Sequence, residues 1–143
     1  MSLSRLKRSA LRAELTYLAA RQELTIRFTS GDGEDGLRAL LSTESGGEEV
    51  FFAVSPLDAS YLSLSLVLVV DEDFFRTNVE DILDVTSRYE VSASLARDDG
   101  LGEGEVYLHL ALRLFLVPLT EAAFALSLEN LRAARDALAA AFP

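Results

Sequence analysis

His109 is the first residue to test for chemistry, because imidazole is a frequent general base in enzymes and a common zinc ligand. It is the one histidine of the chain, and the chain has no cysteine. A zinc site with two histidines or with thiolate ligands is therefore excluded, and a base–nucleophile pair would have to use His109. The residue lies in an alternating apolar segment, which indicates a partly buried strand histidine without a catalytic role.

Two further patterns could bind ligands, but each fits a turn better. The string at residues 31–36 matches the dinucleotide motif G-x-G-x-x-G, yet it contains three acidic residues where phosphate binding needs N–H donors at a helix N-terminus. The acidic group Asp98, Asp99, Glu103 and Glu105 lacks the alternating ligands and the distant glutamate of a calcium loop. We expect no catalytic residue, no metal and no cofactor.

Charge is distributed unevenly along this acidic chain, whose formal net charge is −10. Residues 1–21 contain five basic residues and one acidic residue, a net charge of +4. Residues 22–143 contain eight basic and 22 acidic residues, a net charge of −14. Such a body repels phosphates and favours basic partners, so direct nucleic-acid binding is not expected. An alternative stays open in which a basic patch on the first helix binds nucleic acid: Arg5, Lys7, Arg8 and Arg12.

Length and composition predict one globular domain over residues 1–143. The chain is 50% hydrophobic and 25% charged, which is typical of a folded domain. The longest uncharged run around residues 61–70 is too short for a membrane-spanning helix, and no membrane association is expected. The absence of cysteine fits a cytoplasmic protein.

The clearest structural pattern lies in residues 105–117, where six apolar residues occupy every second position. A period of two predicts a long strand with one apolar face. Residues 89–96 predict its hairpin partner, and apolar residues at helical spacing from Thr120 to Phe142 predict a long helix. The six alternating residues are Val106, Leu108, Leu110, Leu112, Leu114 and Leu116.

The rest of the chain predicts a helix over residues 4–21 and a strand over 24–28. Residues 37–43 allow either a strand or a helical turn, and we favour a hairpin with residues 50–54. Residues 61–70 predict a strand that is central or covered on both faces. Thr77 and Glu80, at capping-box spacing, then predict the start of a short helix.

These elements define an α+β fold, in which a single antiparallel sheet packs against helices in the order helix, strands, helix, two strands, helix. One face of the strand at 105–117 carries the leucines. Three residues of its other face are candidates for a dimer or client surface, although helices of the same chain could cover it: Tyr107, Phe115 and Val117.

The segment at residues 88–96, its Asp98-Asp99-Gly100 turn, the long strand and the helix that opens at Thr120-Glu121 resemble the C-terminal half of YbjN-like proteins. The order of elements is also similar to that of type III secretion chaperones, which are small acidic dimers that hold an extended client segment.

This resemblance implies a non-enzymatic binding module, a chaperone or adaptor that acts as a homodimer on a client protein. The acidic body favours a client that is basic or that itself handles nucleic acid. Two alternatives stay open: a small-ligand sensor or enzyme with an enclosed pocket, and direct nucleic-acid binding through the basic first helix.

Overall fold

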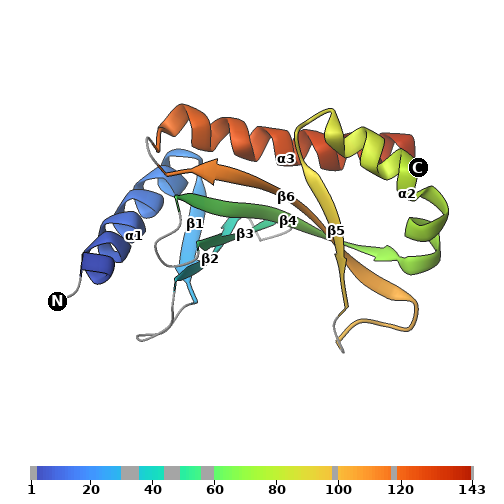
Figure 1. Ribbon diagram of the computed structural model, residues 1–143, viewed down its shortest axis with the longest axis horizontal. Helices are drawn as coiled ribbons and strands as arrows, with labels where there is room; N and C mark the ends of the chain where they lie inside the picture. Colours follow the sequence, from blue (N-terminus) through green and yellow to red (C-terminus); the bar gives the residue numbers. More distant parts are fainter. Residues whose placement is uncertain are drawn as a thin grey trace. The chain divides into compact units, whose positions relative to one another are not determined.

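The computed structural model describes residues 3–29, 36–43, 49–55, 60–97, 100–116 and 119–142, with residues 3–8 described by their backbone. Three helices and six strands occur in this part of the chain (Figure 1). None of these helices is long and apolar enough to cross a membrane. The elements are α1 (Leu3–Arg21), β1 (Leu24–Phe28), β2 (Leu37–Thr43), β3 (Val50–Ser55), β4 (Tyr61–Asp71), α2 (Glu72–Ser87), β5 (Ser92–Ala96), β6 (Glu105–Phe115) and α3 (Glu121–Ala141).

The six strands form one open antiparallel sheet in the order β1-β2-β3-β4-β6-β5. The predicted fold class and order of elements are therefore confirmed. β4 lies between β3 and β6, as expected for a strand that is apolar on both faces at its end. β2 and β3 form the favoured hairpin, in which Leu40 lies opposite Phe52.

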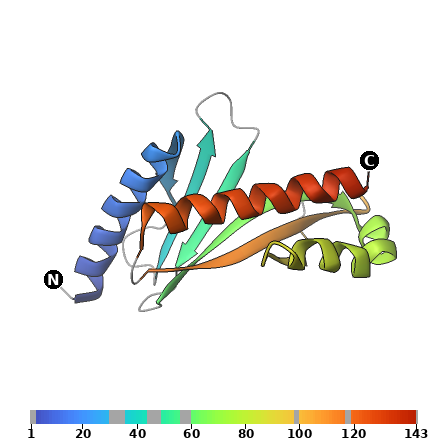
Figure 2. The same cartoon turned by 90° about the horizontal axis from the view of Figure 1, so that it is seen from above.

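The chain divides into two compact units, of which the first comprises Met1–Leu64 and Arg113–Ala125. In this unit α1 lies alongside β1 (Figure 2). Its core contains side chains from helices and strands that are fully buried or nearly so, because the strands alternate between a core face and an exposed face. These core residues include Leu15, Leu18, Leu41, Phe51, Leu62 and Phe124.

The second unit comprises Ser65–Leu112 and Leu126–Pro143. In this unit α2 contacts β5, and the ring of Phe74 meets the ring of Phe142 edge to face at 5.1 Å between centroids. Val106, Leu108 and Leu110 of the predicted leucine face lie inside this core with residues of α2 and α3, and Leu112 is half-buried. The core of this unit includes Leu66, Ile82, Val106, Leu108, Leu110, Leu128 and Leu131. That residues 1–143 form a single domain stays a prediction.

The start of α2 differs from the sequence prediction. The helix begins at Glu72 and not at Thr77, because the side chain of Asp71 caps it: Asp71 Oδ1 accepts a hydrogen bond from the Asp73 backbone N–H at 3.1 Å. Asn78 has non-helical dihedrals within the helix and donates its side-chain N–H to the Phe74 carbonyl. The predicted capping box therefore lies next to a kink inside a longer helix.

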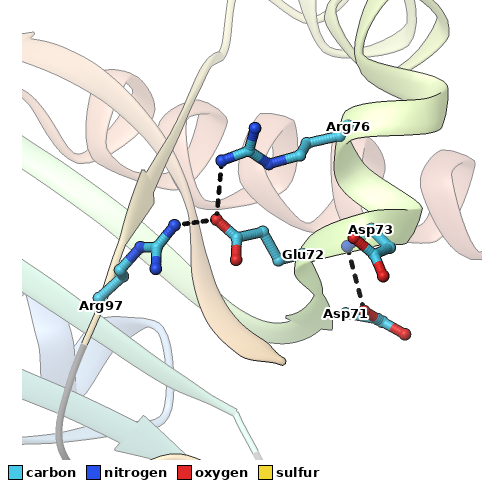
Figure 3. A network of polar contacts seen from close by, with 5 residues as sticks. All are labelled: Asp71, Glu72, Asp73, Arg76 and Arg97. Atoms are coloured by element: carbon cyan, nitrogen blue, oxygen red, sulfur yellow. Dashed lines mark hydrogen bonds and ion pairs between the residues drawn. The ribbon is translucent and has the colours of Figure 1, made fainter. Parts of the chain in front are cut away.

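Glu72 joins the first turn of α2 to its surroundings. Its carboxylate forms ion pairs with Arg76, one turn later, and with Arg97 after β5 (Figure 3). Its backbone N–H donates to the carbonyl of Gly104 at 2.8 Å, and Gly104 has a φ of +81°, which favours glycine. Both arginines are exposed, so each ion pair contributes at most about 1 kcal/mol. The backbone bond anchors α2 to the turn before β6.

The Asp71 cap gives a test of the start of α2. We expect Asp71→Ala to lower the free energy of unfolding by about 1 kcal/mol, because the N–H groups of the first turn lose their acceptor. Asp71→Ser should retain most of the stability. Urea denaturation followed by circular dichroism measures both, with Asp81→Ala in the exposed middle of α2 as the control. An equal loss in Asp71→Ala and Asp81→Ala would contradict the cap.

Alanine substitutions at two leucines of α3, Leu128 and Leu126, test the core of the second unit. Leu128 is fully buried, whereas Leu126 is 56% exposed. We expect Leu128→Ala to lower the free energy of unfolding by about 2–5 kcal/mol, because it leaves a cavity. Leu126→Ala should change it by about 0.5 kcal/mol or less. Denaturant titrations of the two variants side by side give the comparison, and similar losses would show that α3 is oriented differently.

Candidate functional site

The strands of the first unit have one face that is not buried in the core. In β3, Phe51 and Ala53 are buried, while Phe52 and Val54 point to the opposite side and are 38% and 40% exposed. Phe115, at the end of β6, is 63% exposed. We call this side the open face. Its apolar and aromatic side chains, among the residues described, are Leu40, Val50, Phe52, Val54, Tyr61 and Phe115.

Strand register brings residues from distant parts of the sequence together on the open face. Arg27 of β1 lies opposite Leu40 of β2, and Leu40 lies opposite Phe52 of β3. Arg38 lies opposite Val54. Directly opposed residues of an antiparallel pair point to the same face, with Cβ atoms about 4.5–5.5 Å apart. Each exposed apolar side chain of β3 therefore has a neighbour on β2 that continues the surface.

The ends of β4 and β6 add aromatic rings and a third arginine. The N–H of Leu116 donates to the carbonyl of Ser60 at 2.9 Å, so the adjacent Tyr61 and Phe115 are neighbours across the two strands. The guanidinium carbon of Arg113 lies 4.8 Å from the centre of the Tyr61 ring, a cation–π contact. Tyr61 is half-buried and Arg113 is exposed.

The open face has the composition of a protein-contact surface. Exposed apolar patches on folded domains mark interaction sites, and the centres of interfaces are enriched in aromatic residues and arginine. Aromatic anchors and arginines also contribute most of the binding energy at such interfaces. The described side chains of this face are suited to binding.

The predicted candidates Tyr107, Phe115 and Val117 have three different outcomes. Phe115 lies exposed on the open face. Tyr107 belongs to the second unit, where it is half-buried and meets the His109 ring edge to face at 6.3 Å between centroids. Val117 lies outside the described residues. Of the three predicted candidates, Phe115 therefore belongs to the open face, whose other residues include side chains of β2, β3 and β4.

Of the four residues in the predicted basic patch, the structure describes the side chain of one, Arg12. Arg5, Lys7 and Arg8 lie in α1, but their side chains are outside the described part of the chain. The guanidinium carbon of Arg12 lies 4.6 Å from the centre of the Phe28 ring, on the core side of β1. Arg12 is half-buried and links α1 to β1, which is a structural role.

His109 has a partly buried environment in the second unit. Ser94 of β5 is its cross-strand partner. Burial lowers the pKa of the His109 imidazole below its usual value of 6.5, which favours the neutral form. This arrangement fits the predicted strand histidine.

The sequence patterns considered as ligand sites do not form a metal site in the described residues. Residues 31–35 of the glycine-rich string, and Asp98 and Asp99, lie outside that part of the chain. Glu105 accepts a hydrogen bond from the Gly102 N–H at 2.9 Å and closes the turn before β6. Across the described residues, no group of three or more histidine, aspartate or glutamate side chains is positioned to hold a metal ion.

Sequence reasoning missed Phe52, Val54 and Tyr61 as members of the candidate surface. A signal was present in β3, since its sequence VFFAVS is apolar on both faces although the strand belongs to an antiparallel sheet. The neighbours of β3 were not known from the sequence. The surface is visible only once β2, β3, β4 and β6 are placed in order.

Comparison with known proteins gives no match. No family model, no curated protein and no solved structure matches the chain.

The lowered pKa of His109 predicts a dependence of stability on pH. Because the unfolded chain binds this proton more readily than the folded chain, stability is retained above the unfolded pKa of about 6.5 and lost as the pH falls below it. We expect an NMR titration midpoint below 6.5 and a smaller loss of stability between pH 7.5 and pH 5 in His109→Gln. A midpoint above 6.5 would contradict burial as the dominant cause.

Proposed function

We propose that this chain is a non-enzymatic protein-binding module, a chaperone or adaptor that acts on a client protein. The observation that carries this proposal is the open face of the first unit, where aromatic and aliphatic side chains are exposed on a sheet. Phe115 is 63% exposed on the same face as the exposed Phe52 and Val54, and a group of exposed apolar side chains marks an interaction site where a single one does not. A client segment would remove this surface from water.

The proposal includes a homodimer in the cytoplasm and membership of the YbjN-like family, with a fold similar to that of type III secretion chaperones. The α+β architecture, with one antiparallel sheet and three helices, is consistent with both resemblances. The net charge of −10 would keep such a module from non-specific association with other acidic macromolecules. The fold alone does not define the client, because one architecture supports many functions.

Affinity capture from a nuclease-treated lysate of the source cells tests this function. We expect the unaltered chain to retain one or a few proteins reproducibly, and Phe52→Ser combined with Phe115→Ser to lose them, because the variant removes two apolar anchors of the open face. Light scattering on the purified chain measures its mass, which should be twice that of one chain. Mass spectrometry identifies the retained proteins.

Leu126→Ser is the matched control for the capture experiment. It also replaces an exposed apolar side chain by serine, but it lies on α3 in the second unit. The retained proteins should be unchanged in this variant. Retention of the same proteins by the Phe52/Phe115 variant would reject the open face as the client site, and a monomer at micromolar concentration would reject the dimer.

A further inference from the structure

We propose that the two units contain two copies of one motif, a helix followed by a turn and a two-stranded hairpin. The first copy lies within residues 11–43, from α1 through β1 to β2, and the second within residues 78–112, from α2 through β5 to β6. In each copy the first strand of the hairpin is an outer strand of the sheet, and the helix of that copy contacts it (Figure 1).

The same succession of buried, half-buried and exposed residues occurs in both copies. Residues 11–28 align with residues 78–95 without a gap, so that each residue has its equivalent 67 positions later. All 18 pairs of equivalent residues are alike buried, half-buried or exposed. The buried pairs are Leu15 and Ile82, Leu18 and Val85, Ala19 and Thr86, and Leu24 and Val91.

The turn between helix and strand has the same unusual backbone in both copies. Glu23 has a φ of +59° and Glu90 a φ of +58°, and they are the two non-glycine residues with positive φ among those described. This region is unfavourable for residues other than glycine. The Glu23 N–H donates to the Ala20 carbonyl and the Glu90 N–H to the Ser87 carbonyl, both at 3.1 Å. Two helices therefore end in the same way at equivalent positions.

The equivalence continues into the second strand of each hairpin. Arg27 pairs with Leu40, and their equivalents Ser94 and His109 pair with each other. This register aligns residues 37–43 with residues 106–112, 69 positions later. Six of these seven pairs have the same burial, and the exception is Arg38 with Tyr107. The buried pairs are Leu37 and Val106, Ala39 and Leu108, and Leu41 and Leu110.

Amphipathic packing alone explains only part of this likeness. Any helix on a sheet has buried residues every three or four positions, so the helical part of the match is expected. The length of the turn, the left-handed glutamate and the pairing of the hairpin strands depend on different parts of the backbone, and all three agree. One repeated supersecondary unit accounts for them together.

The copies differ on the side of the sheet that faces away from the core. Arg27 and Leu40 of the open face have Ser94 and His109 as their equivalents. His109 therefore occupies a position that is aliphatic in the first copy, and its half-buried environment follows from the motif. The arginine and leucine of the open face belong to the first copy and are not features of the motif.

Exchange of the turn between the copies tests the repeat. In the full chain, residues 20–25 receive the sequence of residues 87–92 through Ala20→Ser, Gln22→Tyr, Leu24→Val and Thr25→Ser. Because each residue enters the environment of its equivalent, we expect cooperative unfolding with a Tm lowered by about 2–8 °C. The reciprocal exchange, which places residues 20–25 at 87–92, should behave alike. Thermal unfolding followed by circular dichroism measures both.

The matched control moves the donor sequence by one position. Residues 20–25 then receive the sequence of residues 88–93, which places valine at the left-handed position 23 and serine at the buried position 24. Its composition is close to that of the first exchange, but its register is wrong. We expect a Tm at least about 10 °C below that of the in-register exchange, or no folded state.

Substitutions at the two glutamates give a second test that changes one residue at a time. Glu23→Val and Glu90→Val should each lower the Tm by about 3–8 °C, because a β-branched residue is disfavoured at positive φ. Glu23→Gly and Glu90→Gly should retain or raise it, since glycine adopts this conformation without a steric cost.

The opposite results overturn the repeat. If the in-register exchange lowers the Tm as much as the shifted one, in either direction, the two turns are not equivalent. If valine is tolerated as well as glycine at one of the two glutamates, the shared conformation of the turn is absent from that copy.

Discussion

The structure depends on a single constraint, the period-two alternation that assigns one side of each strand to the core. In β6 this alternation places Val106, Leu108 and Leu110 in the core, and in β3 it does the same for Phe51 and Ala53. A shift by one residue would exchange the two faces, so burial of the leucine face fixes the register of the strands. The same constraint determines which side chains are left for other functions.

Much of the fold was predictable because these patterns are local. The alternation in residues 105–117 and the helical spacing after Thr120 require no knowledge of the rest of the chain, and both elements occur where they were expected. Thr120 also caps α3, since its side-chain oxygen accepts from the Ala123 N–H. The start of α2 was missed, because Asp71 ends a strand and caps a helix at once, whereas Thr77 and Glu80 gave a stronger local pattern.

The candidate surface was only partly predictable, for a different physical reason. Phe115 was identified from the period of its own strand. Phe52 and Val54 join it through the order of strands in the sheet, which depends on contacts between distant segments. Charge behaves in the same way: the net charge of −10 is a property of the composition, but the positions of Arg27 opposite Leu40 and of Arg38 opposite Val54 arise from register.

The hydrogen bond from the Glu72 N–H to the Gly104 carbonyl has a consequence for motion in the second unit. It joins the first turn of α2 to the turn that precedes β6, two segments about thirty residues apart in the sequence. Fraying of the helix start and opening of that turn are therefore coupled events. Hydrogen exchange at the Glu72 amide would report on the β5–β6 hairpin as well as on the helix to which the residue belongs.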